Sequence, residues 1–473
     1  MAMTKIAEPF DFAPAYNPLM FIYNSTNKNK LGFKYIFQVF AGGTATKIGE
    51  YKVLPRFTDG YGQIDISKLL QSKVSIDFDT TNLTLQDANN TYYKYDVKIG
   101  EEYTEGVAYS SSLTNNAGFV KITSATHTFV AGDQVSVKQA DNGIANPLIE
   151  GLFVVKSVQS STQFTISALW ANVNDATIDG NVYFADNRKT QTLAIITESD
   201  KYVFNGVRTW LDFTTYNQNQ YLIDGTGTQL FVTDLPTTGF MITPTQNLWL
   251  NIANDFVNTD LFCQILNSNG DEFIVQIDIN KKMTQICIGV DTIPTSYTGT
   301  LPIIQDDTTF IQFQLFNSGL DPQSVQYTID IDQRCRINEY DVYFLDKKGS
   351  VSSFGFSLKS YENGTITRQS YNKVNEGFVS GSMWNYSSTE FGQTAYSMQL
   401  EKTYELNTDW MTEEMNVYFE QLVTSPVTFV RFGDEYISCQ ITDTSFEVNR
   451  RRNKNLIRKT ITIKLANQNT INV

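Results

Sequence analysis

The chain has 473 residues, a formal net charge of −14 and a pI near 4.7. Its length suits about two to four domains, and its charge disfavours general nucleic-acid binding because phosphate backbones repel it. Hydrophobic residues make up 41% of the chain, which excludes global disorder. Charged residues make up only 18%, against roughly 25% in ordinary soluble domains. A polar but weakly charged surface favours an extracellular or assembled β-protein over a cytosolic helical enzyme.

The first twenty residues carry acidic residues and prolines, whereas a signal peptide needs a basic start and an apolar run. No stretch approaches the roughly 20 apolar residues of a membrane helix. We therefore expect a protein made in a reducing cytoplasm, with no membrane partner. The four cysteines, at positions 263, 287, 335 and 439, form no CxxC pair, which indicates buried free thiols.

Alternation at period two dominates the chain from its start. Residues 1–105 read as an N-terminal β domain, in which "LGFKYIFQVFAGG" and "KIGEYKVLPRF" form a hairpin. A short helix is expected from Asp65. Residues 106–187 read as an inserted small β-barrel or sandwich, with seven likely inward positions in its short strands: Val135, Val137, Phe153, Val155, Val158, Phe164 and Ile166.

The remainder predicts a β-sandwich over 188–300 and a C-terminal β domain over 301–473. The C-terminal domain carries one helix at about 408–424, capped by Thr408 or Asp409, and a final basic hairpin. Asn-Gly dipeptides such as Asn269-Gly270 and Asn363-Gly364 are typical of tight hairpin turns. The predicted fold is all-β, with several β-sandwich or barrel domains, one or two accessory helices and the inserted small β-barrel-like module.

The segment "EYDVYFLDKKGSVSSFGFSLKS" predicts two strands joined by a turn at Asp346–Gly349. Tyr340, Val342 and Phe344 fall on one face of the first strand, and Phe354, Phe356 and Leu358 repeat the period of two in the second. Such aromatic faces suit contacts between subunits of an assembly, so Tyr340, Phe344 and Phe354 are candidate interface residues.

Motifs for catalysis are missing from the sequence. His127 is the single histidine, without a GxSxG elbow, and neither a GxxxxGK[ST] loop nor a GxGxxG turn before a helix occurs. Asp330 and Asp332 alternate on a strand, as the acids of any solvated strand face do. We therefore expect no catalytic residue, no cofactor and no metal ligand, and a protein that is not an enzyme.

Two other segments could contact partners. In "SGSMWNYSSTEFGQ", Trp384 and Tyr386 could stack on a sugar, although tyrosine-rich strands more often form cores and interfaces. Near the end, Arg450, Arg451, Arg452 and Lys454 form a basic run at the tip of the final hairpin. This run is either a solvated loop or an interface to an acidic protein neighbour or a nucleic acid, and the acidic remainder of the chain favours a protein neighbour.

Several of these segments resemble virion proteins of tailed phages that infect Bacteroidota, crAss-like phages among them. The similar segments are the central strand pair, the opening "NPLMFIYNSTNKNKLGFKYIFQVF" with "DGYGQIDISKLL", and the ending "FGDEYISCQITDTSFEVNRRRNKNLIRKTITIKLAN". The segment "ITSATHTFVAGDQVSV", with the strands that follow it, resembles a small β-module of phage tail and fibre proteins.

The resemblance implies a structural component of the tail, tail tip, baseplate or neck. We expect a homo-oligomeric ring, of three-, six- or twelve-fold symmetry, that joins other phage virion proteins. Its location would be the virion, after assembly in the host bacterial cytoplasm. The alternative is a receptor-binding or adhesin-like tail protein that recognises a host-surface glycan.

Overall fold

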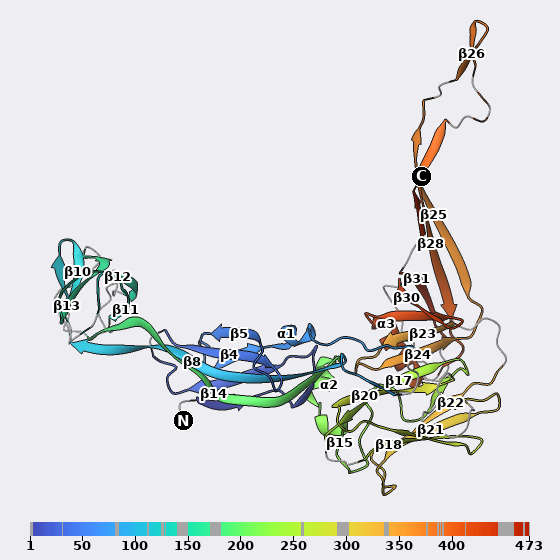
Figure 1. Ribbon diagram of the computed structural model, residues 1–473, viewed down its shortest axis with the longest axis horizontal. Helices are drawn as coiled ribbons and strands as arrows, with labels where there is room; N and C mark the ends of the chain where they lie inside the picture. Colours follow the sequence, from blue (N-terminus) through green and yellow to red (C-terminus); the bar gives the residue numbers. More distant parts are fainter. Residues whose placement is uncertain are drawn as a thin grey trace. The chain divides into compact units, whose positions relative to one another are not determined.

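The computed structural model describes residues 3–30, 32–80, 85–110, 113–123, 127, 129–139, 150–170, 181–256, 260–290, 302–334, 340–374, 377–385, 387, 389, 392–411, 413–442, 458–466 and 469–472. These residues are mostly β-strand (Figure 1). The α-helices among them are α1 (Ser67–Gln71), α2 (Trp210–Thr214) and α3 (Glu413–Thr424), and a 3₁₀ turn spans η2 (Gln218–Gln220). The predicted all-β fold with accessory helices is confirmed. Within the described ranges, no helix has the length and apolar character needed to cross a bilayer.

The chain divides into two compact units. The first unit comprises Met1–Ala13, Pro18–Gln71 and Tyr93–Val203, and the second comprises Pro14–Asn17, Ser72–Tyr92 and Phe204–Val473. The finer boundaries expected near residues 105, 187 and 300 stay predictions.

The first unit contains two sheets. The smaller is antiparallel, in the order β1 (Met3–Ala7), β3 (Met20–Ser25) and β6 (Gly62–Asp65). The larger follows the order β5 (Lys47–Val53), β4 (Lys34–Ala41), β8 (Tyr92–Ser110), β14 (Asn181–Phe204), β11 (Gln134–Gln139), β12 (Glu150–Ser160), β13 (Gln163–Leu169), β10 (Phe119–Thr123) and β9 (Leu113–Asn116), with β2 (Phe12–Pro14) beside β14. The predicted hairpin of β4 with β5 is confirmed, and its alternating Tyr35, Phe37 and Val39 are buried.

A small core of its own lies among β10 to β13. Four of the predicted inward residues belong to it: Val135, Val155, Phe164 and Ile166. Phe153 packs against its margin. Val158 is exposed, because it lies three positions after the buried Val155 and alternation places it on the opposite face. The side chain of Val137 lies outside the described residues.

The second unit contains two main sheets. The larger follows the order β25 (Tyr361–Asn372), β28 (Gln393–Asn407), β31 (Thr460–Leu465), β30 (Glu435–Ile441), β29 (Thr428–Phe432), β23 (Tyr340–Leu345), β24 (Val351–Phe356), β17 (Asn247–Asn254), β20 (Met283–Gly289) and β7 (Leu85–Asp87), with β15 (Leu222–Ile223) beside β17 and β32 (Asn469–Asn472) beside β28. The other follows the order β16 (Phe240–Ile242), β22 (Tyr327–Ile331), β21 (Phe310–Phe316), β18 (Phe262–Asn267) and β19 (Glu272–Gln276). A separate pair is formed by β26 (Phe378–Ser380) and β27 (Met383–Asn385).

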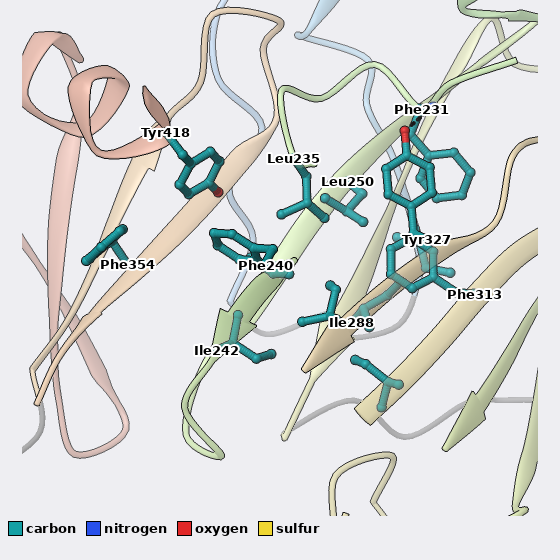
Figure 2. Packing of buried hydrophobic residues seen from close by; sticks show 14 of the residues in the cluster. Phe231, Leu235, Phe240, Ile242, Leu250, Ile288, Phe313, Tyr327, Phe354 and Tyr418 are labelled. Atoms are coloured by element: carbon teal, nitrogen blue, oxygen red, sulfur yellow. Dashed lines mark hydrogen bonds between the residues drawn. The ribbon is translucent and has the colours of Figure 1, made fainter. Parts of the chain in front are cut away.

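Both main sheets contribute to one hydrophobic core. Burial on β21 alternates strictly, so Ile311, Phe313 and Leu315 point inward. The Tyr327 ring lies 5.2 Å from Phe313 and 5.1 Å from Phe231 (Figure 2). This face-to-face burial of two alternating sheets makes the second unit a β-sandwich.

The middle of the larger sheet is buried on its other face as well. Every residue of β17 is buried, and Trp249 projects away from the main core into a second cluster. Phe78, which lies on the segment between α1 and β7, covers this face. Its ring lies 4.9 Å from Trp249, 4.8 Å from Phe429 and 5.3 Å from Tyr436. The aromatic cluster therefore closes the outer face with a residue far away in sequence.

The predicted C-terminal helix exists but begins later than expected. It starts at Glu413 instead of about residue 408. Thr408 does not cap it, because its hydroxyl accepts from the Lys459 backbone N–H and its own N–H donates to the Lys459 carbonyl. Asp409 forms an ion pair with Arg334 at 2.7 Å. Both candidate caps instead bind segments next to strands: Thr408 binds Lys459, just before β31, and Asp409 binds Arg334, after β22.

The Asn-Gly dipeptides had different outcomes. Asn269 and Gly270 form the turn between β18 and β19, with φ of 89° at the glycine. The turn predicted at Asn363-Gly364 is wrong, because both residues pair with β28 inside β25. A long hydrogen-bonded ladder therefore overrides the local turn preference of this dipeptide.

We expect Phe78→Ala to destabilise the second unit by about 3 kcal/mol, since it removes a large ring from an aromatic cluster. Chemical denaturation followed by tryptophan fluorescence measures this, because Trp249 contacts the ring. Phe57→Ala, at a fully exposed phenylalanine, is the control and should leave stability unchanged. Equal stability of the two variants would contradict the role given to Phe78.

Candidate functional site

The predicted strand pair around residue 345 lies in the centre of the second unit. β23 and β24 pair in register, with Val342 opposite Phe354. Phe344 and Phe354 are buried, with Phe344 5.3 Å from the Tyr418 ring and Phe354 5.4 Å from Phe419. Their proposed role at a subunit interface is therefore wrong, because helix α3 of the same chain covers them.

Tyr340 lies at the margin of this core. Its side chain is half-buried and packs against the rings of Phe432, at 5.5 Å, and Tyr404, at 6.1 Å. Part of the residue remains accessible. Its role as an interface residue stays a prediction.

The turn between β23 and β24 contains a buried carboxylate, Asp346. Burial raises its pKa to about 6. A shifted carboxylate is a candidate for acid–base chemistry, and it lies beside a hollow of about 370 Å³ that is lined mainly by apolar surface. The walls of the hollow include Tyr16, Val207, Leu345 and Pro426.

The hydrogen bonds of Asp346 argue for a structural role. One oxygen accepts from the backbone N–H groups of Lys348 and Ser350, each at 2.9 Å. The other accepts from the Thr233 hydroxyl at 2.8 Å and the Asp234 N–H at 3.1 Å. Because both oxygens are engaged by donors of the turn and its neighbour, the carboxylate holds the hairpin and is poorly placed to exchange protons with a substrate.

The other candidates for chemistry are also held within the fold. His127 stacks on Phe129 at 5.2 Å, and burial lowers its pKa. Asp330 is exposed, whereas Asp332 is buried and bonds Arg334 at 2.8 Å, so the two acids do not share a face. Across the part of the chain that the structure describes, no group of three or more His, Cys, Asp or Glu side chains could hold a metal ion.

The thiols agree with the sequence analysis. Cys263, Cys287 and Cys439 are free and buried, and burial raises the pKa of Cys439 to about 11. Cys335 lies outside the described residues. A protonated, buried thiol is a poor nucleophile.

A long antiparallel strand pair of the second unit, β25 with β28, is exposed over much of its length, and we call it the arm. Every residue of β25 is exposed, on both of its faces. Its partner β28 changes environment along its length: Tyr404 and Leu406 are buried in the core, whereas Tyr396 near the other end is exposed. The arm is therefore continuous with the sandwich at its base, and beyond it the described strands beside β28 are β25 and, from Ser397 to Leu400, β32 (Figure 1).

Apolar side chains are exposed along the arm and at the pair formed by β26 and β27. On the arm they are Tyr361, Ile366, Tyr371 and Tyr396. On the β26–β27 pair, which we call the tip, they are Phe378, Val379, Met383 and Trp384. A two-stranded hairpin is marginally stable alone in water, and exposed apolar groups of this kind mark interaction surfaces.

The tip holds Trp384 in a defined position. Gly377 has a φ of 55°, and a Cβ atom there would lie 2.4 Å from the indole ring of Trp384. Only glycine permits so close an approach in this backbone conformation. Trp384 nevertheless keeps 55% of its surface exposed, which is the arrangement of a rigid aromatic anchor.

Several predicted contact residues cannot be placed. Tyr386 and the basic run Arg450, Arg451, Arg452 and Lys454 lie outside the described residues. The strands on either side of this run, β30 and β31, do pair as predicted, with Ile441 opposite Ile463.

The arm was missed by sequence reasoning, because Asn363-Gly364 was read as a turn. The sequence feature that could have predicted the arm is a pair of extended segments in which at least one face of each strand is mostly polar.

Asp346 should make stability depend on pH. Its folded pKa lies above that of the unfolded chain, so the folded state binds the proton more tightly and loses stability as pH rises from about 4 to about 6. The loss amounts to about 3 kcal/mol. Denaturation at several pH values should show this loss for the wild type and lack it for Asp346→Asn. Asp330→Asn removes an exposed carboxylate and is the control, and identical profiles for all three chains would refute the assignment.

Gly377→Ala should displace the Trp384 ring, because the new methyl group occupies its place. ¹⁹F NMR of protein labelled with fluorotryptophan reports this as a shift or broadening of the Trp384 resonance, assigned with Trp384→Phe. Gly381→Ala is the matched control: Gly381 also has a positive φ, of 66°, but a Cβ there meets nothing within 4 Å. A Trp384 resonance that responds equally to both substitutions would contradict the packing described.

Comparisons with known proteins do not identify the chain. No protein-family model matches it, and no curated protein is similar to it at a significant level.

Proposed function

We propose that the chain is a structural component of a tailed-phage virion, which forms a symmetric ring and joins neighbouring virion proteins. The observation that carries this proposal is the arm, a strand pair exposed on both faces and rich in aromatic side chains. Such a hairpin gains stability when a partner covers it. The assignment to a phage particle is supported by the resemblance of the sequence to virion proteins of phages that infect Bacteroidota.

The chemistry of the second unit supports an assembly role over catalysis. Its most strongly shifted carboxylate, Asp346, is committed to the β23–β24 turn. The hollow beside it is lined mainly by apolar surface, so an apolar side chain of a neighbouring protein can fill it. We therefore propose that binding to other virion proteins, not turnover, is what the chain does.

A receptor-binding role is the second candidate, and Trp384 is the observation that favours it. Its ring is exposed and held rigidly over Gly377. Aromatic faces of this kind can stack on sugars. In that case the tip contacts a host-surface glycan while the sandwich attaches to the particle.

One variant separates these roles. Replacing residues 368–398 by Asn-Gly joins Thr367 to Gln399, which are paired in the arm, through a two-residue hairpin turn. Because no described residue among those removed belongs to the main core, the shortened chain should fold with an unchanged melting temperature.

The structural role predicts that particles made with the shortened chain lack it or fail to assemble, as quantified by mass spectrometry of purified particles. The wild-type chain should be present in multiples of three, six or twelve copies. Complete particles that no longer adsorb to cells would support the receptor-binding role instead. Complete and infectious particles containing the shortened chain would contradict both roles for the arm.

A further inference from the structure

Strand β25 is a long free edge of the larger sheet in the second unit. It stands at the end of the strand order, with β28 on one side, and no described strand pairs with its other side. A free edge presents a row of backbone N–H and C=O groups that can pair with another strand. Proteins usually shorten such edges or protect them with charges.

The other edge strands of the described sheets follow that rule. β7 and β16 have three residues each, β9 has four and β19 has five. β5 is longer but carries Lys47, Glu50 and Lys52. β25 has 12 residues and only two charged side chains, Glu362 and Arg368. Its length and low charge set it apart as a pairing edge.

The geometry of β25 selects one register for pairing with an identical strand. Its ladder with β28 is regular from Tyr361 to Gln369, and a bulge follows between Gln369 and Ser370. Thr365 is the middle residue of this regular stretch. If two copies of the stretch overlap fully in antiparallel orientation, Thr365 therefore lies opposite Thr365 of the second copy.

This register is electrostatically self-complementary. It places Glu362 of each copy opposite Arg368 of the other, so two ion pairs form. Within the described residues, Arg368 has no ion-pair partner, whereas Glu362 uses one oxygen to accept from Lys402 at 2.6 Å and keeps the other available. Opposite charges directly across an antiparallel pair are stabilising.

The remaining pairs also fit in this register. On the same face, Gly364 leaves space opposite the exposed Ile366 side chain. On the other face, Asn363 lies opposite Thr367 and the two Thr365 side chains meet, and Thr–Thr pairs are favourable. A shift by two residues in either direction would place Glu362 opposite Ile366 or Ser370 and lose both ion pairs.

We propose that β25 pairs with β25 of a second copy of this chain, antiparallel, about a two-fold axis at Thr365. This inference depends on the proposed assembly role in one respect: it requires that copies of the chain come together. The contact is isologous and closes after two subunits. It therefore links subunits in pairs, and the ring contacts use another surface.

Cysteine crosslinking tests the register. Side chains directly opposite in an antiparallel sheet have Cβ atoms about 4.5–5.5 Å apart, so Thr365→Cys should form a disulfide-linked dimer on mild oxidation of the full chain. Thr367→Cys is the matched control, because in this register it faces Asn363 of the second copy, so its dimer should not become disulfide-linked. A mixture of Asn363→Cys and Thr367→Cys chains should crosslink. Oxidation of the wild-type chain measures any crosslinking through the native cysteines.

Charge reversal tests the ion pairs. Arg368→Glu and Glu362→Lys each place like charges opposite one another, and each should weaken dimerisation by about tenfold or more, as measured by sedimentation equilibrium. An equal mixture of the two variants restores both ion pairs in a mixed dimer and should regain wild-type affinity.

A wild-type chain that stays monomeric at its solubility limit would overturn the proposal. So would a Thr365→Cys yield no higher than that of Thr367→Cys, or a mixture no stronger than either charge variant alone. These outcomes are distinct from failure of the proposed function. If the chain is incorporated into particles but its arm does not pair with a second copy, the virion role holds and only this contact is refuted.

Discussion

The arm depends on one strand, β28, whose two halves lie in different environments. Near Asn407 the strand is fixed by pairing with β31 and by burial of Tyr404 and Leu406 in the sandwich. Towards Gln393 its support is β25 and, over four residues, β32. Because backbone hydrogen bonds are continuous along the strand, the buried half orients the exposed half without any core beneath it. An exposed surface can in this way be held at a distance from the packed protein that positions it.

Alternation predicts which side chains share a face but not which element covers that face. Alternation placed Phe344 and Phe354 on apolar faces of their strands, yet helix α3 buries them, and no local pattern in the strand pair predicts this contact. The same limitation applies to Trp249, whose covering residue Phe78 lies about 170 positions away. The all-β class, the β4–β5 hairpin, the β23–β24 turn and helix α3 were predictable because each has a local pattern.

Local signals misled where a longer-range interaction was stronger. Asn363-Gly364 is a good turn dipeptide, but its residues belong to a ladder with β28 whose many hydrogen bonds outweigh a single turn preference. Thr408 is a good helix cap, but it accepts a hydrogen bond from the backbone N–H of Lys459, just before β31. Trp384 was identified from the sequence as a candidate sugar contact. Its fixed position could not be foreseen, because it depends on the close approach of Gly377 across the tip.

The position of β25 has a consequence for how large an assembly can grow through it. β28 already occupies one edge, so a single partner strand exhausts the hydrogen-bonding capacity that remains. Amyloid fibrils extend because every strand keeps two available edges and each newcomer offers another. A sheet that begins inside a folded sandwich has a closed side, and addition through its open side stops after one step. The architecture thus limits an adhesive edge to one partner, without the short length or the charges that protect the other edge strands.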